Sequence, residues 1–186
     1  QGGQWGSEAK GAIASYIGIN EKVDVAVRTG ATNAGHTVYY KRPPNVEEGA
    51  TNKNIYLDGC DPKPVKMQQL PVGWTNPDTD LVLGAGALID PIILARECEE
   101  VTRLTGQDVR RRLMIDYRAG VHLPVHAERS KESGRHHAIG ATGKGCSEAL
   151  IDKIRLRGKG YKTFGELPIS YDYKVVNTVE ALNDQY

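Results

Sequence analysis

Hydrophobic and polar positions alternate between two periods along the chain. From residue 8 to 19 the apolar positions recur at three- and four-residue spacings, which predicts an amphipathic helix. Residues 23–27 alternate as a strand does, and further short strands are predicted at 37–40, 66–70, 81–83 and 112–116. Two more helices are predicted, one opened by Pro91 and running to about Arg103, and one from 147 to 156.

Strands and helices therefore alternate, and glycines stand at the turns between them. This order predicts an α/β fold with a mainly parallel sheet flanked by helices, in which ligands bind at the carboxyl ends of the strands. The long polar segment 41–64 is expected to be a surface insertion, and residues 160–186 are only weakly patterned. We expect one nucleotide-binding domain over residues 1–186. It would lack the strand that usually precedes a glycine-rich loop.

Composition narrows the class of protein without identifying it. The 186 residues are 39% hydrophobic and 25% charged, with a net charge of +1, which gives no general reason to expect a nucleic-acid or membrane partner. Cys60, Cys98 and Cys146 are far apart and lack the spacing of metal ligands or of a disulfide framework. A reducing, cytoplasmic compartment fits this cysteine usage.

The opening segment GGQWGSEAKG is rich in glycine and leads into the first predicted helix. It is not a Walker A sequence, because Trp5 and Gly11 replace residues that this motif requires. Exposed backbone N–H groups, a helix N-terminus and Lys10 nevertheless combine the features of a P-loop-like phosphate-binding loop. The plain alternative is a tight turn that enters a helix.

Two later loops point to the same chemistry. GATNAGHT, residues 30–37, places a histidine in a polar loop directly after a predicted strand, where a ligand site is expected. GATGKG, residues 140–145, leads into a basic helix suited to a phosphate monoester. The alternatives are a surface histidine and a solvated basic helix face, the latter formed by Lys153, Arg155 and Arg157.

The ordered series of motifs resembles the adenylosuccinate synthetase family, and most closely its archaeal-type and phage branch. The matching segments are QWGSEAKG at 4–11, NAGHT at 33–37, MQQLPVGW at 67–74, LVLGAGALIDP at 81–91, IDYRA at 115–119 and GATGKG at 140–145. The resemblance covers about residues 1–160. It implies a ligase that uses a nucleoside triphosphate and Mg²⁺ to join L-aspartate to C6 of a purine nucleoside monophosphate.

The resemblance also implies roles for particular residues. The implied catalytic residues are Ser7, Lys10 and His36. The implied triphosphate-binding residues are Gly6, Ser7, Glu8, Ala9, Lys10, Gly11, Ala12, Gly35, His36 and Thr37. The implied monophosphate-binding residues are Ser7, Lys10, Asn33, Ala34, Gly35, His36, Thr142, Arg155 and Arg157. The implied Mg²⁺ ligands are Ser7 and the carbonyl of Gly35.

The chain departs from the family pattern at Ser7, where ordinary members carry the aspartate that accepts the N1 proton. A serine hydroxyl is a poor base near neutral pH. A phage branch with serine here acts on dGMP with ATP and aspartate, and a smaller side chain would admit a 2-amino group. A carboxylate could also accept hydrogen bonds from guanine, so the alternative substrate IMP, used with GTP, stays open.

A second departure is Leu156, which stands where the family has an arginine that reaches the substrate phosphate of a partner subunit. The resemblance thus implies a homodimer, in which Arg155 or Arg157 would take that role. Family members are longer, and their later half recognises the base of the triphosphate, so ATP and GTP are not distinguished here.

Two functions of other classes are also considered. One is a non-catalytic nucleotide-binding paralogue, suggested by Ser7 and Ala9. The other is a nucleic-acid-binding domain that uses Arg110, Arg111, Arg112 and Arg118, although this segment lacks interleaved aromatic residues.

Overall fold

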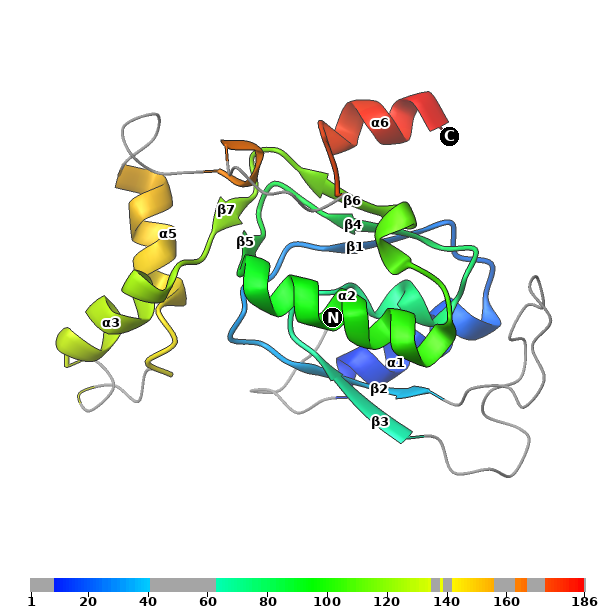
Figure 1. Ribbon diagram of the computed structural model, residues 1–186, viewed down its shortest axis with the longest axis horizontal. Coiled ribbons are helices and arrows are strands. Elements are labelled where there is room, and N and C mark those ends of the chain that lie inside the picture. Colours follow the sequence, from blue (N-terminus) through cyan, green and yellow to red (C-terminus); the bar gives the residue numbers. More distant parts are fainter. Residues whose placement is uncertain are drawn as a thin grey trace.

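A four-stranded parallel sheet forms the centre of the computed structural model, which describes residues 9–40, 63–134, 138, 142–155, 163–166 and 173–185 (Figure 1). The strand order is β1-β4-β6-β8. The bounds of these strands are β1 Val25–Arg28, β4 Asp80–Leu83, β6 Leu113–Asp116 and β8 Lys174–Val176. All three neighbouring pairs are parallel, so the predicted α/β fold with a parallel sheet is confirmed.

Five longer helices and three short 3-10 turns accompany the sheet in the described part of the chain. The helices are α1 Lys10–Asn20, α2 Pro91–Thr105, α3 Pro124–Glu132, α5 Cys146–Arg155 and α6 Thr178–Gln185. The 3-10 turns are η1 Val72–Thr75, η2 Val109–Arg112 and η3 Phe164–Glu166. None of the helices in this part is both long and apolar enough to cross a membrane.

Helix α2 shows how local sequence fixes an element. The Asp90 carboxylate accepts hydrogen bonds from the backbone N–H groups of Ile92 and Ile93, at 3.0 and 3.1 Å, and Pro91 occupies the first helical position. Gly106, with φ of 76°, ends the helix in the left-handed conformation. Start and end signals therefore flank the apolar stripe that packs on the sheet.

Two pairs of strands lie outside the central sheet. β2 (His36–Tyr40) and β3 (Lys63–Met67) form an antiparallel hairpin, and β5 (Leu88–Ile89) pairs in parallel with β7 (Gly120–Val121). Helix α1 lies between the hairpin and the β1 edge of the sheet, whereas α3 and α5 lie together at the opposite end from α6 (Figure 1). The loop 30–37, one of the segments with predicted chemistry, thus follows the carboxyl end of β1 and leads into the hairpin.

The core is built from the buried faces of the central strands and of α2, joined by the hairpin. Its largest fully buried side chains include Trp74, Met67, Leu70, Leu81, Leu83, Ile89, Leu94, Leu113 and Ile115. The Tyr40 ring packs on Trp74 at 5.1 Å between centroids, which ties the hairpin to η1.

Several predicted bounds are corrected by the structure. The strand predicted at 66–70 is β3, Lys63–Met67, because the backbone N–H groups that follow it are bound by the Glu97 carboxylate and cannot extend a strand. Lys63 and Pro64 thus belong to β3, and the rest of the predicted insertion, 41–62, lies outside the described residues. The strand predicted at 23–27 is shifted to β1, and Arg112 ends η2 instead of opening β6.

The prediction also omitted elements. The weakly patterned end of the chain contains β8, which completes the sheet, and α6. Strand β8 is short and only partly covered, so its sequence lacks the apolar run of a buried strand. Helix α3 was missed as well, because its weak amphipathic pattern gives little periodic signal.

Candidate active site

The described start of α1 provides a helix N-terminus next to the predicted phosphate-binding loop. Ala9 precedes the helix in the left-handed conformation, with φ of 54°, and its carbonyl accepts the Ile13 N–H at 2.9 Å. Among the described residues no side chain caps this end, so its first backbone N–H groups are suited to an anion. Gly6, Ser7 and Glu8 lie outside the described residues, and their roles stay predictions.

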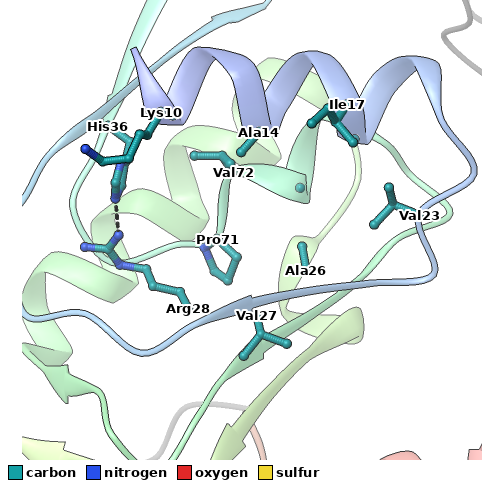
Figure 2. Close-up of a pocket in the computed structure, with 13 residues that line it drawn as sticks. Lys10, Ala14, Ile17, Val23, Ala26, Val27, Arg28, His36, Pro71 and Val72 are labelled. Carbon is teal, nitrogen blue, oxygen red and sulfur yellow. Dashed lines mark hydrogen bonds between the residues drawn. The ribbon is translucent and has the colours of Figure 1, made fainter. Parts of the chain in front are cut away.

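The first two predicted loops come together through a close approach of Gly11 to His36. A Cβ built on Gly11 would lie 2.7 Å from His36 Cβ, closer than any side chain could be accommodated without a shift. Glycine at this position therefore lets the first turn of α1 pack against the start of β2. Figure 2 shows the Lys10 and His36 side chains side by side at this junction.

Arg28 anchors the loop that carries His36. Its Nη1 donates to His36 Nε2 (Figure 2). Its Nη2 donates to the carbonyls of Ala31, Ala34 and Gln68 at 3.2, 3.0 and 2.6 Å. One guanidinium thus joins the end of β1, the loop after it and the turn after β3. Sequence reasoning missed this residue, although its place at the carboxyl end of a parallel strand was a usable signal.

Electrostatics keep His36 neutral. Burial lowers the pKa of His36 below its usual value, and the positive charges of Arg28 and Lys10 lower it further. Burial also lowers the pKa of Arg28, an effect that the nearby Glu97 carboxylate opposes. At neutral pH the imidazole is therefore uncharged, with one nitrogen that donates and one that accepts.

Glu97 of α2 is a second residue that the sequence did not reveal. Its buried carboxylate accepts the backbone N–H groups of Gln68, Gln69 and Leu70 at 2.5, 2.9 and 2.8 Å. These N–H groups belong to the turn whose Gln68 carbonyl accepts from Arg28. Glu97 therefore fixes the turn at residues 68–70, which in turn holds Arg28 and, through it, His36.

The predicted third loop also reaches the second one. Thr32 Oγ1 and Cys146 Sγ lie 3.3 Å apart, which joins the loop after β1 to the first residue of α5. Lys153 of α5 donates from Nζ to the Ala85 carbonyl at 2.6 Å, in the turn after β4. The described ends of the first and third glycine-rich segments, Gly11 and Cys146, thus each contact the loop after β1, at His36 and Thr32.

The end of the third loop is held by α3. Gly143 and Gly145 have φ of 65° and 81°, and a Cβ on Gly145 would lie 2.3 Å from a backbone atom of His126. His122 Nε2 lies 2.7 Å from the Lys144 carbonyl and donates to it. This segment therefore has a defined conformation that only glycine permits at 145.

The remaining predicted site residues have mixed positions. Asn33, Ala34, Gly35 and Thr142 are exposed in these loops and Arg155 is exposed at the end of α5, whereas Ala12 and Thr37 are half-buried. The structure does not test their predicted ligand contacts, and Arg157 lies outside the described residues. The interpretation of Lys153 as part of a solvated face is wrong, because its ammonium is bound to the Ala85 carbonyl.

The arginines considered for nucleic-acid binding mostly have partners within the chain. Arg112 donates to the carbonyls of Trp74 and Asn76 at 2.8 and 2.9 Å and to that of Thr79, and burial lowers its pKa to about 10. Arg111 is exposed, whereas Arg110 and Arg118 form ion pairs with Asp108 and Asp116, at 2.8 and 2.9 Å. These side chains stabilise the fold and leave little support for a basic nucleic-acid surface.

A cavity of about 390 Å³ opens beside the junction of Lys10, Arg28 and His36. One end is lined by these three nitrogen-bearing side chains, and the rest is mainly apolar, between α1, β1 and η1 (Figure 2). The protein is an α/β protein, and glycine-rich segments, a helix N-terminus and cationic side chains near the carboxyl end of a parallel strand are typical of nucleotide-binding members of this class.

Comparison with known proteins specifies the family. The profile of the adenylosuccinate synthetase family matches residues 1–184, and the chain belongs to this family. It is 37% identical to the adenylosuccinate synthetase of Thermococcus sibiricus and 35% identical to that of Methanocaldococcus jannaschii, over 168 and 169 residues. Each alignment covers 89% of this chain but 43% and 42% of the relative, so the chain spans less than half the length of these relatives.

Two solved structures share the fold. The chain is 30% identical to the cyanophage S-2L succinoaminodeoxyadenylate synthetase (PurZ), which was solved bound to dGMP and dATP as an energy donor; the TM-score is 0.72 over 98% of this chain and 45% of that one. Fully ligated adenylosuccinate synthetase from Plasmodium falciparum has a TM-score of 0.73, with 21% identity over 98% of this chain and 46% of that one. The second likeness bears on the fold alone.

Proposed function

We propose that this chain is the nucleotide-binding part of a ligase that joins L-aspartate to C6 of a purine nucleoside monophosphate at the expense of a nucleoside triphosphate. The observation that carries the proposal is the junction of Lys10, the start of α1 and the neutral His36, within a chain of the adenylosuccinate synthetase family. In this reaction a γ-phosphoryl group moves to the 6-oxygen, and the aspartate amino group then displaces phosphate at C6.

The residues of the junction suit the phosphoryl-transfer step. Such a transition state needs positioned donors and positive charge more than covalent help. Lys10 and the first N–H groups of α1 would bind phosphoryl oxygens, and the ring N–H of His36 would donate to the 6-oxygen as charge develops there. Asn33, Thr142 and an arginine at 155 or 157 would hold the phosphate of the monophosphate substrate.

Mg²⁺ would bind mainly through phosphate oxygens of the triphosphate, with few ligands from the protein. Among the described residues no group of three or more histidine, cysteine, aspartate or glutamate side chains could hold a metal ion. The exposed Gly35 carbonyl and the Ser7 hydroxyl fit an ion that takes most of its ligands from phosphate and water. When bound, the ion would neutralise charge on the phosphates during transfer.

We further propose dGMP as the preferred monophosphate and ATP as the energy donor. Ser7 supports this choice, because the phage branch of the family with serine at this position acts on dGMP. The 30% identity to a cyanophage enzyme bound to dGMP and dATP supports it as well. Like its family, the protein would act as a homodimer, and it would do so in the cytoplasm, a reducing compartment that fits its cysteine usage.

A phosphate-release assay tests the activity. The protein is incubated with Mg²⁺, aspartate, ATP or GTP, and either dGMP or IMP, and each component is omitted in turn. We expect release only when all substrates are present, with the highest kcat/KM for dGMP and ATP. Nucleotide binding without turnover in any combination would contradict the proposed ligase and favour the alternative of a non-catalytic nucleotide-binding paralogue.

Lys10→Ala should weaken triphosphate binding about 10- to 100-fold, because an ammonium on a phosphate contributes about 1.5–3 kcal/mol through charge-assisted hydrogen bonds. Turnover should fall as well, since the same charge acts in the transition state. Calorimetric titration with the triphosphate measures the effect. Lys22→Ala, an exposed lysine beyond the end of α1, is the control and should bind normally. Unchanged affinity for Lys10→Ala would contradict the role.

Ser7→Asp should separate the two substrates. A carboxylate would crowd the 2-amino group and cost dGMP about 1–3 kcal/mol, the usual scale of overpacking, which is about 5- to 150-fold in kcat/KM. IMP should be used equally well or better, because it gains the base that ordinary family members carry. The measurement is kcat/KM for both nucleotides with both proteins. A strong preference of the unmutated protein for IMP would overturn the dGMP assignment.

A further inference from the structure

The contacts of His36 determine which of its ring nitrogens carries the proton. A guanidinium has only N–H donors, so the His36 Nε2 that faces Arg28 Nη1 must accept. In a neutral imidazole the other nitrogen then carries the hydrogen. The neutral form therefore exists here as the Nδ1–H tautomer.

That hydrogen lies on the side of the ring that borders the first turn of α1. A Cβ built on Gly11 would come within 3.1 Å of His36 Nδ1, so Nδ1 borders the first turn of α1. The side chain of Lys10 lies beside the same ring (Figure 2). Because position 11 is glycine, no side chain of the helix fills the space next to Nδ1.

Arg28 is itself fixed from several directions. Its Nη2 donates to three carbonyls, and the nearest of them, Gln68, belongs to the turn held by the buried Glu97 carboxylate. A guanidinium bound on both of its terminal nitrogens has a defined plane. It therefore fixes the orientation of the imidazole as well as the position of its proton.

We propose that Arg28 is a positioning residue that holds His36 as the Nδ1–H tautomer and directs this N–H toward the start of α1. The catalytic consequence rests on the proposed function, but the tautomer does not. A histidine that donates to the reacting oxygen must present a hydrogen there before the reaction begins. Arg28 fixes both the tautomer and the ring orientation of His36 in the protein without substrate. A lysine would place all its donors on one nitrogen, so it lacks the planar fork by which Nη1 faces His36 while Nη2 faces the carbonyls.

Histidine-selective ¹⁵N NMR of the full protein tests the tautomer without turnover, since the two ring nitrogens give different shifts and couplings in each tautomer. The signals are assigned by their loss in His36→Ala. We expect the unmutated protein to show the Nδ1–H tautomer, and Arg28→Met to show a mixture or the Nε2–H form. Arg103→Met, which removes an exposed arginine of α2, is the matched control and should leave the signals unchanged. An Nε2–H tautomer in the unmutated protein would overturn the proposal on its own.

Kinetics then test whether Arg28 acts through His36. Arg28→Met should lower kcat about 10- to 100-fold, part of the contribution of a general acid–base group, with KM for both nucleotides changed less than about threefold. The double variant Arg28→Met/His36→Ala should be no slower than His36→Ala alone, because the two residues form one unit. Losses that multiply in the double variant would contradict the proposal.

Two further measurements separate positioning from folding and from the proposed activity. If Arg28→Met does not fold, Arg28→Lys is used; it should also lose the single tautomer, and retention of the Nδ1–H form in that variant would contradict the proposal. If no nucleotide supports turnover but the tautomer is present and depends on Arg28, the positioning role stands and the proposed function fails.

Discussion

Replacing His36 with alanine should lower turnover by about two to four powers of ten while triphosphate affinity changes little. The size of the loss is that of a positioned proton donor or acceptor, and the imidazole acts on charge that develops mainly during transfer. Its neutral state, which burial and the neighbouring cations maintain, means that binding of the ground-state phosphates depends on Lys10 instead. Single-turnover phosphate transfer and calorimetric titration measure the two quantities separately.

Two amide variants sharpen this expectation. An asparagine at 36 can place an N–H near the position of Nδ1, whereas a glutamine reaches the position of Nε2. Because Nε2 is occupied by Arg28, His36→Asn should retain more activity than His36→Gln. An unchanged rate for His36→Ala would show that the histidine only supports its loop.

Glu97→Ala should lower the free energy of unfolding by about 3–5 kcal/mol, the range seen when a buried charged network loses a member. The substitution leaves three backbone N–H groups without their acceptor and removes the carboxylate that faces Arg28. Each buried donor left unsatisfied costs about 1–3 kcal/mol, partly recovered if water enters. Urea unfolding followed by circular dichroism measures the change.

A matched control lies on the same helix. Glu100 pairs with Arg103 at 2.6 Å, but both side chains are largely exposed. Glu100→Ala should therefore change stability by less than about 1 kcal/mol. A loss of that small size for Glu97→Ala would mean that the turn after β3 does not depend on the carboxylate.

The parts of the fold that follow local rules were predictable. Asp90, Pro91 and Gly106 mark the ends of α2, and the apolar run of β6 identifies a buried strand. The position of the loop after β1 was predictable too, because a segment that follows the carboxyl end of a parallel strand lies at the edge where ligands bind. Short-range pattern and topology together thus placed these elements and this loop.

The residues that organise the site were not predictable from pattern. Glu97 stands among charged residues of α2 and would be expected to face solvent, yet its partners lie 27–29 positions earlier. The contact of Lys153 was equally unpredictable, since its partner Ala85 is 68 positions away in the sequence. A buried charge is retained because it satisfies groups that are distant in sequence, and no local window contains them.

The parallel sheet has a consequence for how the chain acquires its structure. Neighbouring strands place Ala26 beside Leu81, Leu81 beside Leu113, and Ile115 beside Val175, so each contact joins residues more than 30 positions apart. Such non-local pairing slows folding, because the entropy cost of closing a long loop comes before the stabilising contacts between the paired strands form. We expect the helices and local turns to form first and β8 to dock last. Until then, the edge of β6 stays open to pairing with other chains during synthesis.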